Sequence, residues 1–176
     1  LAFGDELSYL EPEPDGRKYS INAYKITNAT TNPPTESTTE LDCTRNPIWV
    51  QTVATSFGLA FDRCLGTATT ASGQVLAQPG QKVEHLPAQI AAVQGAALNE
   101  NDLALMLVGM HDILEIYGRY PNESAASLIE VARSRARVYG EAINALAQSG
   151  PAVVVLTVLA ISAYMTLKGL FGQWRA

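Results

Sequence analysis

The chain has 176 residues, of which 47% are hydrophobic and 16% are charged, a balance that excludes a disordered segment or a low-complexity fibre. Its length suits one domain of ordinary size. Twelve basic against seventeen acidic residues give a net charge of -5, so we expect no basic stripe and no nucleic-acid partner. Residues 1–42 hold eight acids and three bases, whereas residues 43–176 hold nine of each, so the net charge is concentrated near the start.

The first predicted element is a short buried strand over residues 1–3, which ends in a tight turn at Gly4. A long excursion over residues 9–42 follows, rich in Pro, Thr, Asn, Asp and Glu, and we expect a hairpin around residues 19–26. Loops of this length are usually functional or disordered, and the sequence does not say whether this excursion forms a lid.

A helix is predicted from Pro47 to a stop at Gly58, because Pro suits the first helical position and Gly suits a C-terminal stop. Trp49, Val53 and Phe57 recur every four residues along it. This spacing predicts that the three side chains share one face and point into the core.

Small and polar residues 65–81 separate this helix from a second one, predicted over residues 82–93 with Pro87 in its first turn. Residues 102–108 then form a nearly continuous apolar run that ends at Gly109. Such a run is typical of a central strand in a parallel sheet, which is buried on both faces.

The longest predicted helix runs over residues 121–148. Arg133 and Arg137 lie near Glu130 and Glu141 at helical spacing, which indicates a solvated face. The expected core stripe consists of Leu128, Ala132, Tyr139, Ala142, Ile143 and Leu146.

Residues 151–167 carry no charge, and a stretch of seventeen residues is the short limit for a transmembrane helix. Its first part, residues 152–158, is dominated by β-branched residues and follows a Gly-Pro break. We therefore expect a buried strand there and no transmembrane span. A final helix is expected over residues 162–174.

The order strand, helix, strand, helix, strand predicts an α/β domain with a parallel sheet, right-handed crossovers and helices on both faces. In such sheets ligands bind beyond the carboxyl ends of the strands. Two of these ends carry titratable residues: Asp5 and Glu6 follow the first strand, and His111 and Asp112 follow the central one.

Three short motifs resemble those of the GDSL-type (SGNH) lipases and esterases, in the order in which that family has them. Residues 3–8, Phe-Gly-Asp-Glu-Leu-Ser, resemble the first block, normally Phe-Gly-Asp-Ser-Leu-Ser. Residues 79–83 resemble the second block, a Gly followed by a helix, and residues 108–114 resemble the third, a strand followed by Gly-x-Asn-Asp. Residues 43–50 also resemble the segment after the variable loop in bacterial secreted members.

The resemblance implies a three-layer flavodoxin-like parallel sheet, with residues 1–176 as an incomplete N-terminal portion of it and residues 9–42 as the variable loop. It also implies a carboxylic ester hydrolase that acts on small-molecule or lipid esters without a cofactor, in a secreted or periplasmic location. In that family a Ser attacks the ester carbonyl. The Ser N–H, the second-block Gly N–H and the third-block Asn side chain stabilise the oxyanion.

Carried onto this chain, the resemblance places five residues at the catalytic site: Asp5, Glu6 at the nucleophile position, Gly80 in the oxyanion hole, His111 at the oxyanion-hole Asn position, and Asp112. Glu6 stands where the family has Ser, and His111 where it has Asn. The late Asp-x-x-His motif that activates the Ser does not occur in these residues, and we expect the native chain to continue to it or to have lost it. A carboxylate where the oxyanion must form opposes acyl transfer, so conventional activity is expected to be impaired or absent.

Other interpretations of the same residues stay open. The first is a non-catalytic relative that binds an ester, a glycan or a lipid. The second is an oxygen-rich metal site formed by Asp5, Glu6, His111 and Asp112. The third is purely structural: Asp5 caps a following helix, His111 starts one, and Gly80 is a turn glycine.

Cys43 and Cys64 match no zinc motif. From the residues alone they are either two buried thiols or a disulfide that closes a loop of about twenty residues. The resemblance to secreted family members favours the disulfide.

Two tripeptides, Asn28-Ala-Thr30 and Asn122-Glu-Ser124, match N-glycosylation acceptors. They matter only in a eukaryotic secretory pathway. Chance matches in polar loops are the favoured interpretation from the sequence.

Overall fold

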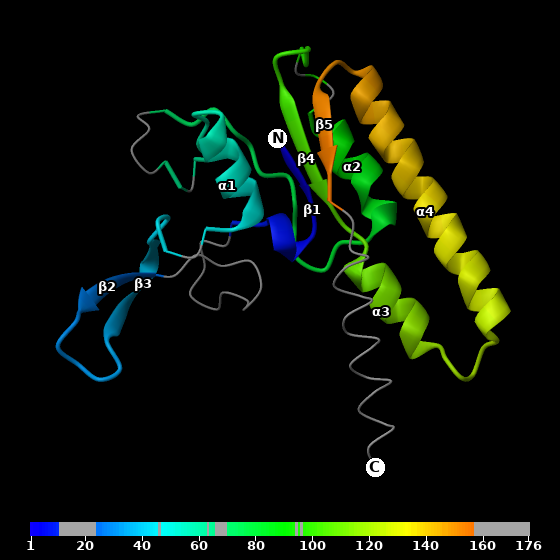
Figure 1. Ribbon diagram of the computed structural model, residues 1–176, viewed down its shortest axis with the longest axis horizontal. Helices are drawn as coiled ribbons and strands as arrows, with labels where there is room; N and C mark the ends of the chain where they lie inside the picture. Colours follow the sequence, from blue (N-terminus) through cyan, green and yellow to red (C-terminus); the bar gives the residue numbers. More distant parts are fainter. Residues whose placement is uncertain are drawn as a thin grey trace.

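The computed structural model describes residues 1–10, 24–45, 47–62, 64–65, 70–93, 95 and 97–156, with the backbone alone for residues 38–41. Three parallel strands form its central sheet in the order β1-β4-β5 (Figure 1). They are β1 (Ala2–Gly4), β4 (Leu103–Leu107) and β5 (Ala152–Val155). The three predicted strands are confirmed, with β4 in the centre of this sheet. The predicted burial of the third is wrong, because β5 pairs only with β4 among the described strands and its residues are alternately exposed and half-buried. Residues 157–158 of this prediction lie outside the described residues.

The free edge of β1 carries one more parallel contact. Ala2 forms an isolated bridge with Val75, in which the Ala2 N–H donates to the Gln74 carbonyl (2.9 Å) and the Leu76 N–H donates to the Ala2 carbonyl (2.7 Å). Since β4 pairs with the other edge of β1, the spatial order is Val75 segment, β1, β4, β5.

Helices cover both faces of the sheet and give three layers (Figure 1). These helices are α1 (Trp49–Ser56) on one face and α2 (Leu86–Ala91) and α4 (Ala125–Gln148) on the other. Successive strand residues point to opposite faces, so Phe3 and Met106 pack in the core under α2 and α4, whereas Ala2 and Leu105 pack in the core under α1. The predicted α/β class, with a parallel sheet between two helical layers, is confirmed.

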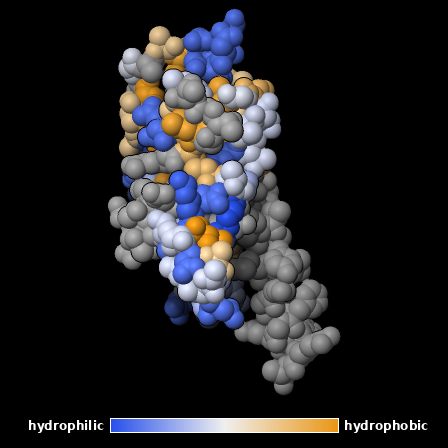
Figure 2. Space-filling view, turned by 90° about the vertical axis from the view of Figure 1, so that its left-hand side faces the viewer, coloured by the Kyte–Doolittle hydropathy of each residue, from blue (hydrophilic) through white to orange (hydrophobic). Residues whose placement is uncertain are grey.

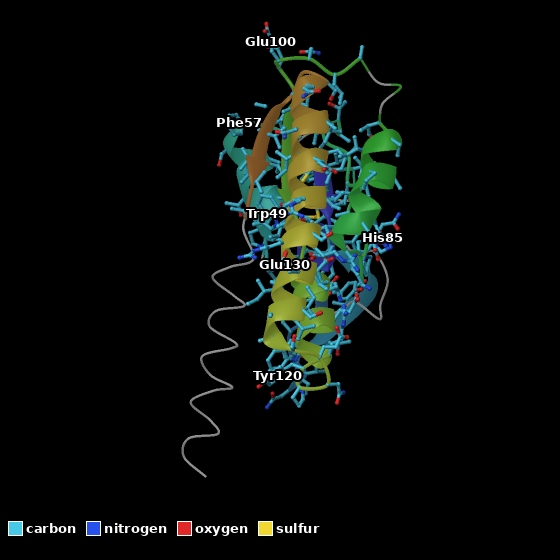
Figure 3. The ribbon with its side chains drawn as sticks, turned by 90° about the vertical axis from the view of Figure 1, so that its right-hand side faces the viewer. Trp49, Phe57, His85, Glu100, Tyr120 and Glu130 are labelled. Carbon is cyan, nitrogen blue, oxygen red and sulfur yellow. A yellow bond between two sulfur atoms is a disulfide. The ribbon has the colours of Figure 1, made fainter. Side chains whose placement is uncertain are left out.

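Helix α1 begins and ends close to the expected residues, and Trp49 and Val53 pack against the core as predicted, but Phe57 does not. Gly58 follows it with a φ of +69°, the left-handed conformation that glycine adopts readily. Val50 and Ala54 are buried, whereas Phe57 is 66% exposed (Figure 3). The core assignment of Phe57 is wrong because the helix ends at Ser56, which leaves Phe57 at the C-cap.

The predicted helix over residues 82–93 is a 3₁₀ turn, η2 (Val83–His85), that continues into α2 with Pro87 in its first turn, as expected. The helix α3 (Met110–Gly118), which follows Gly109, was not placed in the predicted order of elements, but the structural interpretation of His111 as a residue at a helix start is confirmed.

Helix α4 begins at Ala125, four residues later than expected, because the Ser124 hydroxyl caps it by accepting from the Ser127 N–H (3.2 Å). Of its predicted core stripe, Leu128, Ala142 and Leu146 are buried and Tyr139 and Ile143 pack against the core. Ala132 is exposed, which contradicts the prediction. Figure 1 shows that the first half of α4 extends past the sheet, alongside α3. Core residues predicted in that half, such as Ala132, therefore have no sheet to pack against.

A two-stranded hairpin projects from the α1 side of the molecule (Figure 1). It consists of β2 (Tyr24–Asn28) and β3 (Thr35–Leu41). The hairpin was predicted earlier in the chain, around residues 19–26, and residues 19–23 lie outside the described residues. Figure 2 looks at this side, and the lower part of the face, where the hairpin lies, is mostly white and blue.

Cys43 and Cys64 form a disulfide, which confirms the pairing implied by the family resemblance. It joins the segment after the hairpin to the loop after α1. In the described residues no helix is both long enough and apolar enough to cross a membrane. The helix predicted over residues 162–174 lies outside them.

Candidate active site

The candidate site lies at the carboxyl ends of β1 and β4, the end that the sequence indicated. Glu6 opens a 3₁₀ turn, η1 (Glu6–Ser8), directly after β1. His111 is in the first turn of α3, directly after β4, and Gly80 is in the turn before η2. Three segments far apart in the sequence therefore meet here.

The Glu6 carboxylate is the centre of the site. Its Oε2 accepts a hydrogen bond from the Gly80 N–H (2.9 Å), and the Nε2 of His111 lies 2.7 Å from Oε1 and 2.9 Å from Oε2. An ionised carboxylate only accepts hydrogen bonds, so the His111 Nε2–H donates to it. The Glu6 side chain is 10% exposed and the His111 side chain 28%, so the pair is sheltered but open to solvent on the imidazole side.

These contacts decide the charge state of Glu6. Burial disfavours the ionised form, but the Gly80 N–H and His111 outweigh it and hold the pKa of the Glu6 carboxyl below its usual range. At neutral pH the site therefore contains an anion that belongs to the chain itself, held by one backbone donor and one ring donor.

Asp5 is fully buried next to Glu6 and acts as the N-cap of η1. Its Oδ1 accepts from the Leu7 N–H (3.0 Å), and its Oδ2 has no hydrogen-bond partner among the described residues. Burial raises the pKa of the Asp5 carboxyl to about 6, although the Leu7 N–H opposes the shift. The structural interpretation of Asp5 as a cap is thus confirmed.

Asp112 follows His111 on α3 but points to a different partner. Its Oδ2 accepts from the Val83 N–H (3.0 Å), and its Oδ1 lies 3.5 Å from Nη1 of Arg135. Asp112 therefore ties the start of α3 to the start of η2, three residues beyond Gly80, and connects the two segments that supply donors to Glu6.

The metal interpretation finds no support in the described residues. No group of three or more His, Cys, Asp or Glu side chains is arranged there to hold a metal ion. Asp5 and Asp112 are instead hydrogen-bonded to backbone N–H groups of Leu7 and Val83, on separate segments.

Gln89 supports the site and was not identified from the sequence. Its Oε1 accepts from the Gly4 N–H (2.8 Å) and its Nε2 donates to the Gly4 carbonyl (2.9 Å), so one buried side chain satisfies both groups of that residue. Gly4 has a φ of +129°, and a Cβ at this position would lie 1.8 Å from the Leu107 carbonyl oxygen. The sequence signal was a glutamine on the apolar face of the helix predicted over residues 82–93.

A rim of alternating charges lies beside Asp112. Arg135 of α4 has Nη1 2.6 Å from Glu84, and its Nη2 is 3.7 Å from Glu115, which also pairs with Lys82. The sequence assigned the neighbouring arginines of this helix to a solvated face and overlooked Arg135. Arg135 of α4 contacts residues of α3 and η2, and these contacts become apparent only from the packing of the helices.

Two other groups with possible chemistry, Ser8 and His85, have hydrogen-bond partners other than Glu6. The buried Ser8 hydroxyl accepts from Nε1–H of Trp49 (3.2 Å). His85 accepts the Lys82 N–H on its Nδ1 (2.9 Å), so this histidine closes a local turn beside α2 (Figure 3).

A small cavity of about 110 Å³ lies elsewhere, at the amino ends of β1 and β4 under α1. Its lining includes Leu1, Leu59, Phe61, Asp102 and Leu103. Because ligands in parallel sheets bind at the opposite, carboxyl ends, we place the candidate site at Glu6 rather than in this cavity.

Comparison of the chain with models of protein families, with curated protein sequences and with solved structures finds no match. Function is therefore inferred from the motifs and the geometry of this chain alone.

Proposed function

We propose that the chain carries the catalytic-site region of a GDSL-type (SGNH) carboxylic ester hydrolase in which Glu6 occupies the nucleophile position, so that conventional hydrolysis is impaired or absent. The observation that carries the proposal is the convergence of Gly80 and His111 on the Glu6 carboxylate. Small-molecule or lipid esters are the substrate class of the active form.

The strand order supports the flavodoxin-like part of the proposal. Numbered along the chain, the segment at Val75, β1, β4 and β5 have the spatial order 2-1-3-4, with which the flavodoxin-like order 2-1-3-4-5 begins. The chain leaves β1 toward one edge and later crosses to the other, so the switch point lies between β1 and β4. Ligands of doubly wound sheets bind at such a point, and Glu6 and His111 follow these two strands.

The donor arrangement supports the acyl-transfer part. Stabilising a tetrahedral intermediate requires preorganised donors aimed at the developing oxyanion. The Gly80 N–H and the His111 Nε2–H both point at one spot, but a carboxylate already fills it. The same contacts therefore support an oxyanion-hole origin and a loss of conventional activity.

The disulfide supports the proposed location. Structural disulfides persist in oxidising compartments and are rare in the cytosol. The Cys43–Cys64 bond therefore favours a secreted or periplasmic protein.

Hydrolysis of p-nitrophenyl acetate by three forms of the chain tests the proposal. Wild type should not exceed the buffer rate. Glu6→Ser should hydrolyse the ester about tenfold faster. It supplies a hydroxyl and frees donors of a kind worth about 10²–10³ in acyl transfer, but the Asp-x-x-His motif that would activate the hydroxyl does not occur in residues 1–176, so the gain is smaller than that. Glu6→Ala, the matched control, frees the same donors without a nucleophile and should remain at the wild-type rate.

Folding of each variant is checked by its thermal melt. If folded Glu6→Ser and Glu6→Ala hydrolyse the ester equally, the Gly80 N–H and the His111 ring do not form an acyl-transfer site. Wild-type turnover well above buffer that disappears in Glu6→Ala would show that the carboxylate itself takes part in hydrolysis, and the proposed loss of activity would be wrong.

A second candidate is a non-catalytic protein that binds an ester, a glycan or a lipid. The Glu at position 6, where the family has Ser, favours this candidate. Without an attacking hydroxyl, the segments around the site can still bind a ligand. Titration with p-nitrophenyl butyrate, with binding and product release followed together, separates the candidates. Saturable binding without product supports the binding protein, whereas absence of binding at millimolar concentration contradicts it for this class of ester.

A further inference from the structure

The turn of the hairpin carries an acceptor tripeptide that the proposed ester hydrolase does not use. Asn28 ends β2, and the chain turns back through exposed residues to β3. Asn28, Ala29 and Thr30 form the pattern Asn-x-Thr, which an oligosaccharyl-transfer enzyme recognises in the secretory pathway of a eukaryotic cell.

The local geometry presents the two recognised side chains together. The Oδ1 of Asn28 accepts from the Thr30 N–H (2.9 Å) and from the Thr30 hydroxyl (2.7 Å). Both donors use the carbonyl oxygen of the amide, and none of these bonds uses the Nδ2 group that would be modified. The tripeptide is exposed at every position, so a glycan on Asn28 would extend into solvent without burying or displacing any described core residue.

The second tripeptide, which starts at Asn122, differs in this respect. The Ser124 hydroxyl accepts from the Ser127 N–H and caps α4. The middle residue, Glu123, is held by a two-point ion pair with Arg119, in which Nε and Nη2 each donate at 2.7 Å. This acceptor is therefore part of a fixed helix start, whereas the first lies on a projecting turn.

The disulfide is consistent with passage through a eukaryotic secretory pathway. Cys43–Cys64 links the segment just after the hairpin to the loop after α1, and such bonds form in the compartments through which secreted proteins pass. The same compartment supplies the glycosylation machinery in a eukaryotic cell.

We propose that, in a eukaryotic secretory pathway, Asn28 is an N-glycosylation site and Asn122 is not. In the reaction, Nδ2 of Asn28 forms a bond to the anomeric carbon of a polyprenyl-diphosphate-linked oligosaccharide. The bond from that carbon to the diphosphate oxygen breaks, the diphosphate leaves with the electron pair, and Nδ2 loses one proton. The inference does not depend on ester hydrolysis, since no residue of the Glu6 site takes part.

Secretion of the full chain from yeast behind a cleavable leader tests it. Wild type should lose the mass of one oligosaccharide on treatment with peptide-N-glycosidase F, and in heavy-oxygen water the enzyme should leave a labelled aspartate at position 28. Asn28→Gln and Thr30→Ala should abolish the mass shift, whereas Thr30→Ser, which keeps the hydroxyl, should retain it. Asn122→Gln, the matched control, should shift as wild type does.

A non-reducing peptide map that shows the Cys43–Cys64 bond establishes that each secreted form has folded in the oxidising compartment. Folded wild type that carries no glycan would overturn the proposal. A mass shift that survives Asn28→Gln and disappears in Asn122→Gln would overturn it as well, because it would place the glycan on the helix start.

Discussion

Asp5 is a carboxyl group whose surroundings oppose its charge. Its pKa in the folded chain is about 6, above the usual value of about 3.9 in an unfolded chain. The folded state therefore favours the protonated form. Its contribution to stability is fully present below about pH 4 and is lost as the pH rises through about 6.

Asp5→Asn should remove this pH dependence while keeping an oxygen that accepts from the Leu7 N–H. The variant should gain about 2–3 kcal/mol over wild type at pH 7 and nothing at pH 4, because a shift of one pKa unit corresponds to about 1.4 kcal/mol. Urea unfolding at both pH values measures the difference. Asp5→Ala, which loses the cap, should cost about 1 kcal/mol at pH 4. If Asp5→Asn raised the free energy of unfolding equally at both pH values, the charge of Asp5 would not be the cause of the gain.

At the scale of the elements, Gln89 joins α2 to the end of β1, two residues before Glu6. Gln89→Ala would leave the Gly4 N–H and carbonyl without their side-chain partner in a buried place. We expect a loss of about 1–3 kcal/mol in the free energy of unfolding, the cost of one unsatisfied buried group, because the Gly4 N–H loses its partner while the Gly4 carbonyl still accepts from the Gln78 N–H (3.1 Å). Denaturant unfolding measures it, with the exposed Gln78→Ala as a control expected within about 0.5 kcal/mol of wild type. Equal effects of the two variants would show that the Gln89 contacts contribute little.

The elements differ in how well the sequence predicted them. A buried parallel strand is a continuous apolar run, so β4 was predictable, and β1 was recognisable from its glycine turn. The start of β5 was predictable from its β-branched residues, although the strand is not buried. Helix α3 was missed because Ile113, Leu114 and Tyr117 are partly exposed and blur the helical period. The hairpin was placed too early because its turn contains several polar and proline residues without one decisive signal.

The candidate site was predictable only in part, for a related reason. The order of strands and turns places Glu6 and His111 at neighbouring strand ends, and a motif identifies Gly80. Gln89 and Arg135 lie on helices, and their roles depend on how each helix is rotated and packed, which a single sequence does not specify. Asp112 accepts a hydrogen bond from the Val83 N–H. This contact also depends on how the segments pack, which the sequence does not specify.

At the scale of the whole molecule, the disulfide connects the hairpin segment to the layer that covers one face of the sheet. Its two cysteines are 21 residues apart, and a loop of this size stabilises a fold by about 3 kcal/mol in the chain-entropy model. Dithiothreitol should lower the unfolding free energy of wild type by about that amount. The double variant Cys43→Ser with Cys64→Ser should resemble reduced wild type and should not respond to the reductant. An unchanged midpoint for reduced wild type would show that the bond is not needed for stability.

The pairing of β1 with β4 also has a consequence during synthesis. Glu6 and His111 are 105 residues apart, and Asp112, which ties the Gly80 turn to α3, is translated one residue after His111. At about 5–20 residues per second, a ribosome leaves the newly made Glu6 carboxylate without its imidazole partner for roughly 5–20 s. Throughout this interval the apolar first strand has no β4 to pair with. Chaperone capture of nascent chains should therefore fall once translation has passed the end of α3.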